Sequence, residues 1–371
     1  MTKLTPRPTA QREDLVQGPL APPIPRVDPI TDLPLLVLFP HSRCNCRCLM
    51  CDIWRVTTAD EIESREVAAW LSEWRAFGVK RVVLSGGEAL LHSHLWELCE
   101  LLRQADIGIT ILSTGLLLRR HATELVRYCD DVVVSLDGPR EIHDKIRNIP
   151  RAYDRLADGV AAVKAADQSV RVSGRCTVQR ANFRELRRTV VAAREIGLDR
   201  ISFLAVDVST EAFNRPGGWG GERVREVALQ RHELPLLAAE LDAMELDCAT
   251  AFATGYIAEG PDKLRRLHQY FAALLGEGDF APPDCNAPWV SAVIETDGTV
   301  RPCFFQPPLG NIREAESLDA IINSPEAVAW RRGLDTHRDA ICRKCVCSLT
   351  LRRASDTMMG IEAPNEARSY G

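Results

Sequence analysis

The sequence predicts an α/β fold built on a parallel sheet. After the first 32 residues, short runs rich in β-branched residues alternate with longer runs of helical periodicity. Parallel neighbouring strands need helical crossovers, so six strands that are each followed by a helix indicate a parallel sheet. Periodicity leaves open whether this sheet is open or rolled into a partial barrel. The predicted strands are Leu35–Phe39, Arg81–Ser85, Ile109–Ser113, Asp131–Leu136, Val170–Val178 and Arg200–Ala205.

The helical runs between these strands carry their apolar residues on one face, as helices packed against a sheet do. The first run follows the first strand and ends at Gly78, a typical C-terminal stop. Its apolar face consists of Val67, Trp70, Leu71, Trp74 and Phe77. Similar faces recur at Leu95, Leu98, Leu101 and Leu102, and at Phe183, Leu186, Val190 and Val191. Two further helical runs, Leu234–Leu246 and Asp262–Leu275, follow the sixth strand.

Length and charge limit the classes of function. A chain of 371 residues is long enough for one large domain with a small appendage. The net charge of -5 gives no broad basic field, so we expect no nucleic-acid partner. No secretory signal is apparent and no apolar run reaches about 18 residues, so neither secretion nor membrane insertion is predicted. We therefore expect a cytoplasmic protein that acts on a small molecule or a peptide.

Cysteine is the most informative residue type in this chain. Of thirteen cysteines, four lie in residues 44–51 and three in residues 342–347. Without a secretory signal, such clustering predicts metal binding rather than disulfides. Cys44, Cys48 and Cys51 form a C-x3-C-x2-C pattern just after the first predicted strand. Because a four-iron cubane is normally held by four thiolates, three of them leave one iron open; a zinc loop is the alternative.

The second predicted strand ends in the glycine-rich turn Ser85-Gly86-Gly87-Glu88. Together with the three cysteines, this turn resembles the radical S-adenosylmethionine (SAM) superfamily, and the likeness extends over about residues 33–350. The resemblance implies that the three cysteines bind a [4Fe-4S] cluster and that SAM chelates its open iron. One electron from a reductant such as flavodoxin or ferredoxin then cleaves SAM to methionine and a 5′-deoxyadenosyl radical. Ala89 stands where the family usually has proline.

The same resemblance implies SAM contacts at the ends of successive strands. Gly86 and Gly87 let backbone carbonyls approach the SAM amino group, and Glu88 takes its ammonium charge. Arg175 on the fifth strand pairs with the SAM carboxylate, which suits guanidinium geometry. The other predicted contacts, beside SAM or its ribose or the substrate, are Ser113, Ser135 and Asp137.

Two further segments are singled out by their composition. Residues 142–147 resemble the family's His-Asp-x-x-Arg stretch and end at Arg147. For Arg147 and Arg175, a surface ion pair is the alternative interpretation. The glycine-rich run at residues 215–221 predicts either an ordinary surface loop or a lid over the strand ends.

A second cysteine-rich region begins at Cys285. Twelve residues separate Cys285 from Gly298 and four separate Gly298 from Cys303, with a hairpin signal at Asp297-Gly298. A C-x2-C pair follows, and four cysteines make a closed site for which structural zinc is the alternative to iron. The region resembles the twitch domain, the shorter relative of the SPASM domain. That resemblance implies an auxiliary [4Fe-4S] cluster held by Cys285, Cys303, Cys342 and Cys345.

The resemblance also implies the domain organisation. We expect a partial (βα)6 TIM-like barrel with trailing helices over residues 33–279 and a small Cys-rich twitch domain over residues 280–350. A proline-rich extended segment, residues 1–32, precedes them and can wrap the domain, since the first 30 residues hold seven of the 22 prolines. Residues 351–371 form a C-terminal tail.

The function implied by the resemblance is that of a radical SAM oxidoreductase. Hydrogen abstraction from a substrate C–H bond would dehydrogenate or epimerise a small carbohydrate- or aminocyclitol-like metabolite. Cys248 is a candidate hydrogen donor for an epimerisation, with simple packing as the alternative. Two other functions stay open: a peptide maturase that oxidises or cross-links a residue, and a non-catalytic protein that binds metal. The roles of Cys46 and Cys347 are unassigned.

Overall fold

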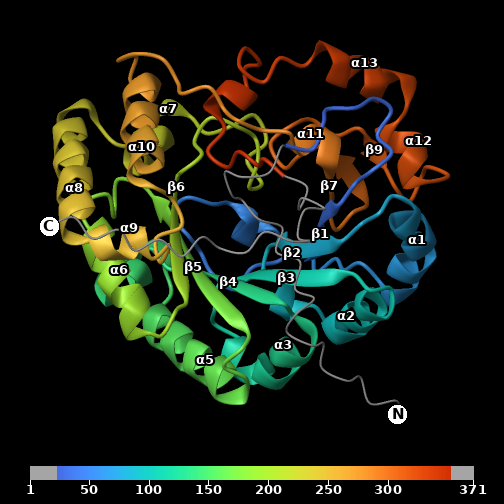
Figure 1. The fold of residues 1–371 in the computed structure, drawn as a ribbon, viewed down its shortest axis with the longest axis horizontal. Coiled ribbons are helices and arrows are strands. Elements are labelled where there is room, and N and C mark those ends of the chain that lie inside the picture. Colours follow the sequence, from blue (N-terminus) through green and yellow to red (C-terminus); the bar gives the residue numbers. More distant parts are fainter. Residues whose placement is uncertain (1–22, 352–371) are drawn as a thin grey trace, which may run out of the picture.

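The fold is an arc of parallel strands that continues into a short antiparallel hairpin (Figure 1). The computed structural model describes residues 23–351. As predicted, six strands alternate with helices and pair in parallel, in the order β6-β5-β4-β3-β2-β1. These strands are β1 Leu35–His41, β2 Arg81–Gly86, β3 Gly108–Ser113, β4 Asp131–Ser135, β5 Arg171–Val178 and β6 Arg200–Ala205. Their observed ends differ from the predicted ones by two residues at most.

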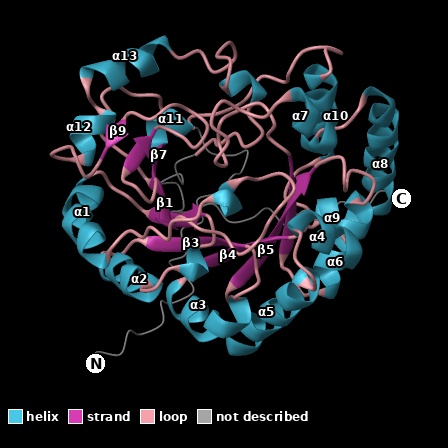
Figure 2. Ribbon diagram, turned by 180° about the vertical axis from the view of Figure 1, so that it is seen from behind, coloured by secondary structure: helices cyan, strands magenta, loops and turns pink. Residues whose placement is uncertain are grey.

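The helices that connect these strands lie on the convex side of the arc, so the sheet forms an open, partial barrel (Figure 2). The helices of the barrel are α1 Ser64–Ala76, α2 Leu95–Gln104, α3 Ala122–Tyr128, α4 Arg140–Arg147, α5 Ala152–Ala166 and α6 Leu186–Glu195. The trailing helices are α7 Gly221–Val227, α8 Leu234–Asp247, α9 Ala249–Ala253 and α10 Pro261–Leu274. Three short helices follow in the Cys-rich region, α11 Ala287–Val290, α12 Leu318–Ile322 and α13 Pro325–Gly333.

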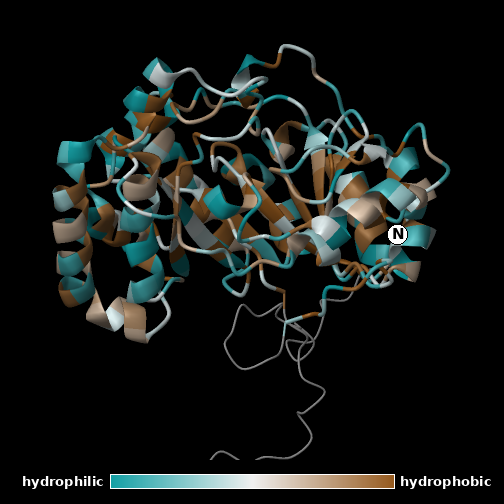
Figure 3. Cartoon of the chain, turned by 90° about the horizontal axis from the view of Figure 1, so that it is seen from above, coloured by the Kyte–Doolittle hydropathy of each residue, from teal (hydrophilic) through white to brown (hydrophobic). Residues whose placement is uncertain are grey.

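Successive side chains along each strand point to opposite faces of the sheet, one face toward the hydrophobic core and the other toward the barrel interior. In β5, Val172, Cys176 and Val178 are fully buried against the helices. The residues between them, Arg175 and Thr177 among them, are only half-buried and face the other side of the sheet. The strands form an apolar layer and the outward helical faces are hydrophilic (Figure 3). Polar side chains in the open barrel therefore belong to the strand face that the helices do not cover.

The predicted α1 helix shows how local sequence sets an element's ends. A capping box between Glu63 and Glu66 starts it, and Gly78, at a φ of +68°, follows its end. Trp74 is fully buried on its apolar face. The sequence prediction for this helix is confirmed.

The Cys-rich region extends the barrel sheet. Strand β7, Ser291–Ile294, pairs in parallel with β1, and β8, Thr299–Arg301, pairs antiparallel with β7 around the predicted Asp297-Gly298 turn. A two-residue strand, β9 (Gly310–Asn311), ends the sheet. The sheet is therefore continuous across the boundary that the sequence suggested near residue 280. This pairing places the second cysteine group beside β1, the strand that leads to the first cysteine group.

The described part of the N-terminal segment lies on the Cys-rich region. The Ile24 backbone N–H donates to the Leu351 carbonyl at 3.0 Å, and Arg26 donates to the Cys285 carbonyl at 2.8 Å. Asp28 pairs with the buried Arg331 of α13. Residues 1–22 and 352–371, predicted as an extended segment and a tail, lie outside the described residues. Within residues 23–351, no helix has both the length and the apolarity to span a bilayer.

Candidate active site

The loop that carries the first cysteine group, residues 42–52, rests on the C-terminal end of α4. The Arg47 N–H donates to the Arg147 carbonyl at 3.1 Å, and the Leu49 N–H donates to the Ile146 carbonyl at 3.0 Å. These carbonyls are free because the last turn of a helix has no intrahelical donors for them. The stretch that resembled the family's His-Asp-x-x-Arg motif is thus the support of the cysteine loop.

The three predicted ligands, Cys44, Cys48 and Cys51, act on one another electrostatically. Burial, followed by the neighbouring Cys48, raises the pKa of the Cys44 thiol to about 12, and the same two causes raise the pKa of Cys51. The pKa of Cys48 is lowered to about 7, first by a hydrogen bond from the Cys46 thiol and then by the charge of Arg147. Cys48 is therefore the thiol of this group that is most readily deprotonated. Cys46, which the sequence left unassigned, supports it.

A buried ion pair stands behind Cys48. Arg147 lies 2.6 Å from the Asp137 carboxylate and also donates to the Cys48 sulfur at 3.4 Å. The other Asp137 oxygen accepts the Thr177 N–H at 3.0 Å, and Asp137 is fully buried. Asp137 was predicted to contact the ribose or the substrate; in the structure its carboxylate is fully buried and lies beside Arg147. The surface ion pair considered for Arg147 is wrong, because its ion pair is buried.

The three predicted ligands lie near one another, since Cys48 raises the pKa of both the Cys44 and the Cys51 thiol. Three neighbouring cysteine thiols are the donor type of an iron–sulfur site.

Glu88 joins the ends of β2 and β3. Its fully buried carboxylate accepts the Thr114 N–H at 2.7 Å, the Thr114 hydroxyl at 2.6 Å, and the Ser113 hydroxyl at 3.0 Å. The Leu90 N–H donates to it as well, at 3.1 Å. Burial raises the pKa of Glu88, and these four donors oppose that rise. Glu88 and Ser113 were predicted to contact SAM; a direct contact of the Glu88 carboxylate with an ammonium group would have to replace one of these donors.

The two glycines of the turn let the cysteine loop lie directly on the end of β2. Gly86 has a φ of +95°, a conformation that favours glycine, and the Glu88 N–H donates to the Arg43 carbonyl at 2.8 Å. A Cβ built on Gly87 would lie 2.1 Å from that same carbonyl oxygen. Close backbone approach is thus required here by the cysteine loop itself.

We expect replacement of Gly87 with alanine to displace the cysteine loop, because the new methyl group overlaps the Arg43 carbonyl. Overpacking of this kind costs about 1–3 kcal/mol. Urea unfolding of the chain and the iron bound after anaerobic reconstitution would measure the two effects. Gly333→Ala is the matched control, because its Cβ would meet nothing within 4 Å. Equal iron loading in the two variants would show that the close approach at Gly87 does not hold the loop.

A polar row crosses the interior face of three neighbouring strands. Ser135 on β4 pairs in register with Arg175 on β5, and Arg175 pairs with Ser202 on β6. The Arg175 Nε atom is buried and finds no hydrogen-bond acceptor among the described residues. An orphaned guanidinium nitrogen between two hydroxyls fits an anionic ligand such as a carboxylate. Ser202 was missed by the sequence, because only the register identifies it.

The loop after β6 is docked on the cysteine loop. Trp219 donates its indole N–H to the Asp52 carboxylate at 2.6 Å, and Asn214 donates to the Asp52 carbonyl at 3.0 Å. The Asp52 N–H in turn donates to the Phe213 carbonyl at 3.1 Å. Asp52 directly follows Cys51, so this loop fixes the last predicted ligand. Loop 215–221, predicted as a surface loop or a lid, therefore includes a contact that supports the cysteine loop.

The second cysteine group contains five thiols. The pKa of Cys303 is raised to about 11, chiefly by burial and to a smaller extent by the neighbouring Cys285 and Cys347. Burial raises the pKa of Cys345 as well, followed by the charge of Cys347. Cys342 is held differently, since its sulfur accepts a hydrogen bond from Gln306 at 3.2 Å. Cys347, to which the sequence assigned no role, thus lies near enough to Cys303 and Cys345 to raise the pKa of their thiols.

A cavity of about 800 Å³ lies between the two cysteine groups. It is lined by the start of the cysteine loop, the Gly86-Gly87 turn, the loop after β6 and the segment that follows Cys303. Four phenylalanines form one wall: the ring of Phe304 lies 5.3 Å from Phe39 and 4.9 Å from Phe213, in edge-to-face contacts, and Phe305 adjoins them. The cavity has the size and mixed lining of a small-ligand or side-chain site.

Cys248, the candidate hydrogen donor, lies at the opposite end of the barrel. It stands between α8 and α9, near Asp247 and near Arg194 in the last turn of α6. Ile257, which follows α9, bridges to Ile201 at the start of β6. Cys248 therefore sits near the N-terminal strand ends, whereas the cysteine loop follows the C-terminal end of β1. The hydrogen-donor hypothesis is not supported by this position.

Comparison with known proteins identifies both cysteine regions. The chain matches the family model of the Radical SAM superfamily over residues 38–193 and the SPASM model, an iron-sulfur cluster-binding domain, over residues 285–346. The AdoMet-dependent heme synthase of Methanosarcina barkeri is 25% identical over 85% of this chain and 92% of that protein. The PqqA peptide cyclase of Ruegeria pomeroyi is 26% identical over 77% of this chain and 72% of that protein.

The solved structure of anSMEcpe with bound AdoMet and the Cp18Cys peptide has a similar fold. Its TM-score is 0.60, at 20% identity, over 86% of this chain and 92% of that one. The similarity covers the partial barrel and the Cys-rich region together. Each matched family region contains one of the two cysteine groups.

Proposed function

Because this chain is a radical SAM protein with a C-terminal SPASM domain, whose cofactors are SAM and [4Fe-4S] clusters, we propose that it oxidises a peptide substrate. The observation that carries this choice of substrate is the cavity between the two cysteine groups, with its aromatic wall and unpaired carboxylates. When bound, the cluster and SAM supply a 5′-deoxyadenosyl radical that removes hydrogen from a substrate C–H bond.

The chain's own residues orient SAM in this proposal. Arg175 binds the carboxylate of SAM with the guanidinium nitrogen that has no partner among the described residues. Ser135 and Ser202 flank it in the same row and donate to the ribose or the carboxylate. The carbonyls of the Gly86-Gly87 turn accept from the amino group, while Glu88 keeps the turn in place.

The charge of the cavity lining favours some classes of substrate over others. Asp60 and Glu211 line the cavity and are exposed, and no ion pair is recorded for either among the described residues. Both arginines that line the cavity form ion pairs within the chain: Arg301 pairs with Glu295 at 2.6 Å, and Arg215 pairs with Asp207. A substrate with neutral or cationic side chains suits this lining, and the phenylalanine wall suits an apolar or aromatic side chain.

The rival substrates fit less well. A tetrapyrrole with several carboxylates, the type of product named for the heme synthase relative, would bring like charges to Asp60 and Glu211. The sequence alone favoured a carbohydrate-like metabolite, but the relatives found here include synthases and a peptide cyclase and give that class no support. We therefore prefer the peptide maturase alternative to the carbohydrate one.

The second cysteine group supports an oxidative outcome. Removal of one hydrogen atom leaves a substrate radical, and loss of a second electron and a proton then gives a two-electron-oxidised product. Cys285, Cys303 and the neighbouring thiols would hold an iron–sulfur cluster, which would supply an acceptor for that electron. The sequence assigned Cys342 and Cys345 to this site, and these ligand assignments remain proposals.

The proposal is tested with anaerobically reconstituted protein, SAM and dithionite. Peptides that differ only by Lys→Glu exchanges are compared for 5′-deoxyadenosine formation and for a mass loss of two hydrogen atoms. We expect the lysine peptides to be oxidised faster, and Glu211→Gln to reduce that preference. Turnover of a porphyrin or a carbohydrate, with no turnover of any peptide, would overturn the substrate assignment. Absence of 5′-deoxyadenosine under every condition would overturn the enzyme assignment.

A further inference from the structure

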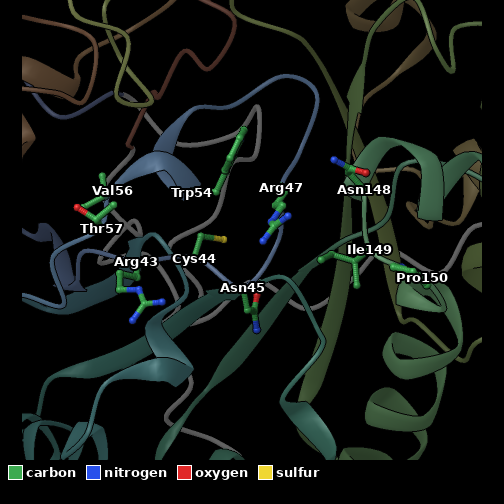
Figure 4. A pocket seen from close by; sticks show the side chains of 10 residues that line it. All are labelled: Arg43, Cys44, Asn45, Arg47, Trp54, Val56, Thr57, Asn148, Ile149 and Pro150. Carbon is green, nitrogen blue, oxygen red and sulfur yellow. The ribbon is translucent and has the colours of Figure 1, made fainter.

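A small cavity lies where the last strand of the barrel meets the Cys-rich region. It is distinct from a cavity of about 560 Å³ beside Cys44, which belongs to the cysteine loop (Figure 4). We call it the edge cavity; it is lined by the end of β6, one face of α10, the linker after α10 and the segment around Cys345. It shares no lining residue with the substrate cavity. Its volume is about 90 Å³, whereas ligand pockets commonly measure about 300–1,000 Å³, so it suits a single side chain.

The end of β6 that lines the edge cavity belongs to an open edge of the sheet. β6 is the last strand in the sheet order. The segment after α9 covers its first half: the Ile201 N–H donates to the Tyr256 carbonyl at 2.8 Å. The Phe203 N–H donates to the Glu259 carboxylate at 3.0 Å. The last two residues of β6 line the edge cavity beyond this cover. A strand edge of this kind offers backbone hydrogen bonds to an extended peptide.

Three cationic side chains line the edge cavity. Lys263 and Arg266 lie one turn apart on α10, and Arg343 belongs to the Cys-rich region. All three are exposed, and no ion pair is recorded for any of them within residues 23–351. None of the lining residues is acidic. The edge cavity is therefore complementary to an anionic group.

The acidic groups of the neighbouring segments stand outside this lining. The Glu259 carboxylate accepts a backbone N–H of β6, and burial raises its pKa while Lys263 opposes that rise. Asp262, Asp279 and Asp284 are exposed beside lining residues but do not line the edge cavity. A carboxylate that enters the edge cavity would therefore meet the three cations directly.

The edge cavity adjoins the substrate cavity, whose charge is opposite. Ile341 lines the substrate cavity and Arg343, two positions further on, lines the edge cavity. Two residues span at most about 7 Å. The substrate cavity has exposed acidic groups at Asp60 and Glu211, so one ligand that enters both cavities meets acidic groups in one and cations in the other. Because an extended peptide advances about 3.3 Å per residue, these contacts fall about three to five positions apart in its sequence.

We propose that the edge cavity binds an acidic side chain of the peptide substrate, about three to five residues from the residue that is oxidised. The inference rests on the proposed function, because a peptide is the substrate class that places one side chain in each cavity. The carboxylate pairs with Lys263, Arg266 and Arg343, and the peptide backbone lies along the open edge of β6. The opposite charges of the two cavities then set the direction in which the peptide lies.

Calorimetric titration of the reconstituted protein with two synthetic peptides tests this inference. Both peptides contain a phenylalanine followed by a lysine. The fourth positions before and after the phenylalanine are aspartates in one peptide and asparagines in the other. We expect the aspartate peptide to bind about fivefold more tightly at low ionic strength, and this advantage to shrink as salt is added.

Two variants locate the binding site of the aspartate. In Lys263→Gln/Arg266→Gln the advantage should fall to about twofold or less. Arg343 is left unchanged, because it directly follows Cys342 in the second cysteine group. The control is Arg75→Gln/Lys80→Gln, which removes the same charge. Arg75 and Lys80 are exposed near the N-terminal end of β2, so the control should keep the fivefold advantage.

Equal affinity of the wild type for the two peptides, or binding of neither, would overturn the inference. An equal loss of the advantage in the control would also overturn it, because net charge alone would then explain the preference. Loss of iron from Lys263→Gln/Arg266→Gln would assign these cations to the second cluster instead. Oxidation of both peptides without a difference in affinity would leave the proposed function standing without this site. A retained preference without any 5′-deoxyadenosine would leave this site standing and overturn the enzyme assignment.

Discussion

Replacement of Arg147 with methionine is expected to lower the free energy of unfolding by about 3–5 kcal/mol, because it leaves a buried carboxylate without its partner. Arg147 and Asp137 are both buried and lie 2.6 Å apart. The same change removes the N–H donor to the Cys48 sulfur. Urea unfolding of the cluster-free chain measures the first effect, and iron bound after anaerobic reconstitution measures the second.

Two further variants separate the causes. Lys145→Met lies on the same helix, at an exposed position, and should unfold as the wild type does. The double variant Arg147→Met/Asp137→Leu removes both charges, so it should recover much of the stability lost in the single variant. It lacks the donor to Cys48 and should therefore still load less iron. If the single variant unfolded at the wild-type urea concentration, the ion pair would not hold this part of the barrel together.

Arg147 shows which features of the site could be predicted from the sequence and which could not. The strands, the helices and the two cysteine groups follow from local patterns, because periodicity and spacing are properties of neighbouring residues. The stretch that ends at Arg147 was recognised as well, but its partner was not. Arg147 and Cys48 are 99 positions apart and meet only because β4 and α4 return the chain to the loop after β1. Local patterns do not specify such a contact.

Burial was the property of the predicted ligand-binding residues that the sequence could not specify. Glu88, Ser113 and Asp137 stand at strand ends, where a ligand is expected, and their polarity suggested exposure to it. The structure shows that Glu88 and Asp137 are fully buried, Glu88 among four hydrogen-bond donors of the chain and Asp137 in an ion pair with Arg147. Arg175 has a buried nitrogen without a hydrogen-bond acceptor among the described residues. Whether a polar group has spare capacity depends on its neighbours in space.

Contacts between distant loops were the least predictable part of the site. Asp52 and Trp219 are 167 positions apart, yet they join the cysteine loop to the loop after β6. The pairing of β1 with β7 joins residues 256 positions apart, Leu35 and Ser291, and brings the SPASM region to the edge of the barrel. Neither has a local signal, since each depends on the complete sheet order. The substrate cavity is formed by these same segments, so the substrate could not be predicted from local patterns.

Cys48→Ala is expected to abolish 5′-deoxyadenosine formation, because two thiolates cannot hold the cluster that binds SAM. Iron in the reconstituted protein should fall to about half, since the cluster of the SPASM region has its own ligands. Anaerobic iron and sulfide analysis and chromatographic detection of 5′-deoxyadenosine measure the two effects.

Cys46→Ala is the matched control within the same loop. Cys46 is buried, lies two positions from Cys48, and lowers the pKa of the Cys48 thiol. If Cys44, Cys48 and Cys51 are the ligands, Cys46→Ala should keep both clusters and continue to cleave SAM. The lost S–H donor should slow cleavage without stopping it, because Arg147 still donates to the Cys48 sulfur. Full loss of the first cluster in Cys46→Ala, with retention in Cys48→Ala, would mean that the spacing rule selected the wrong thiol.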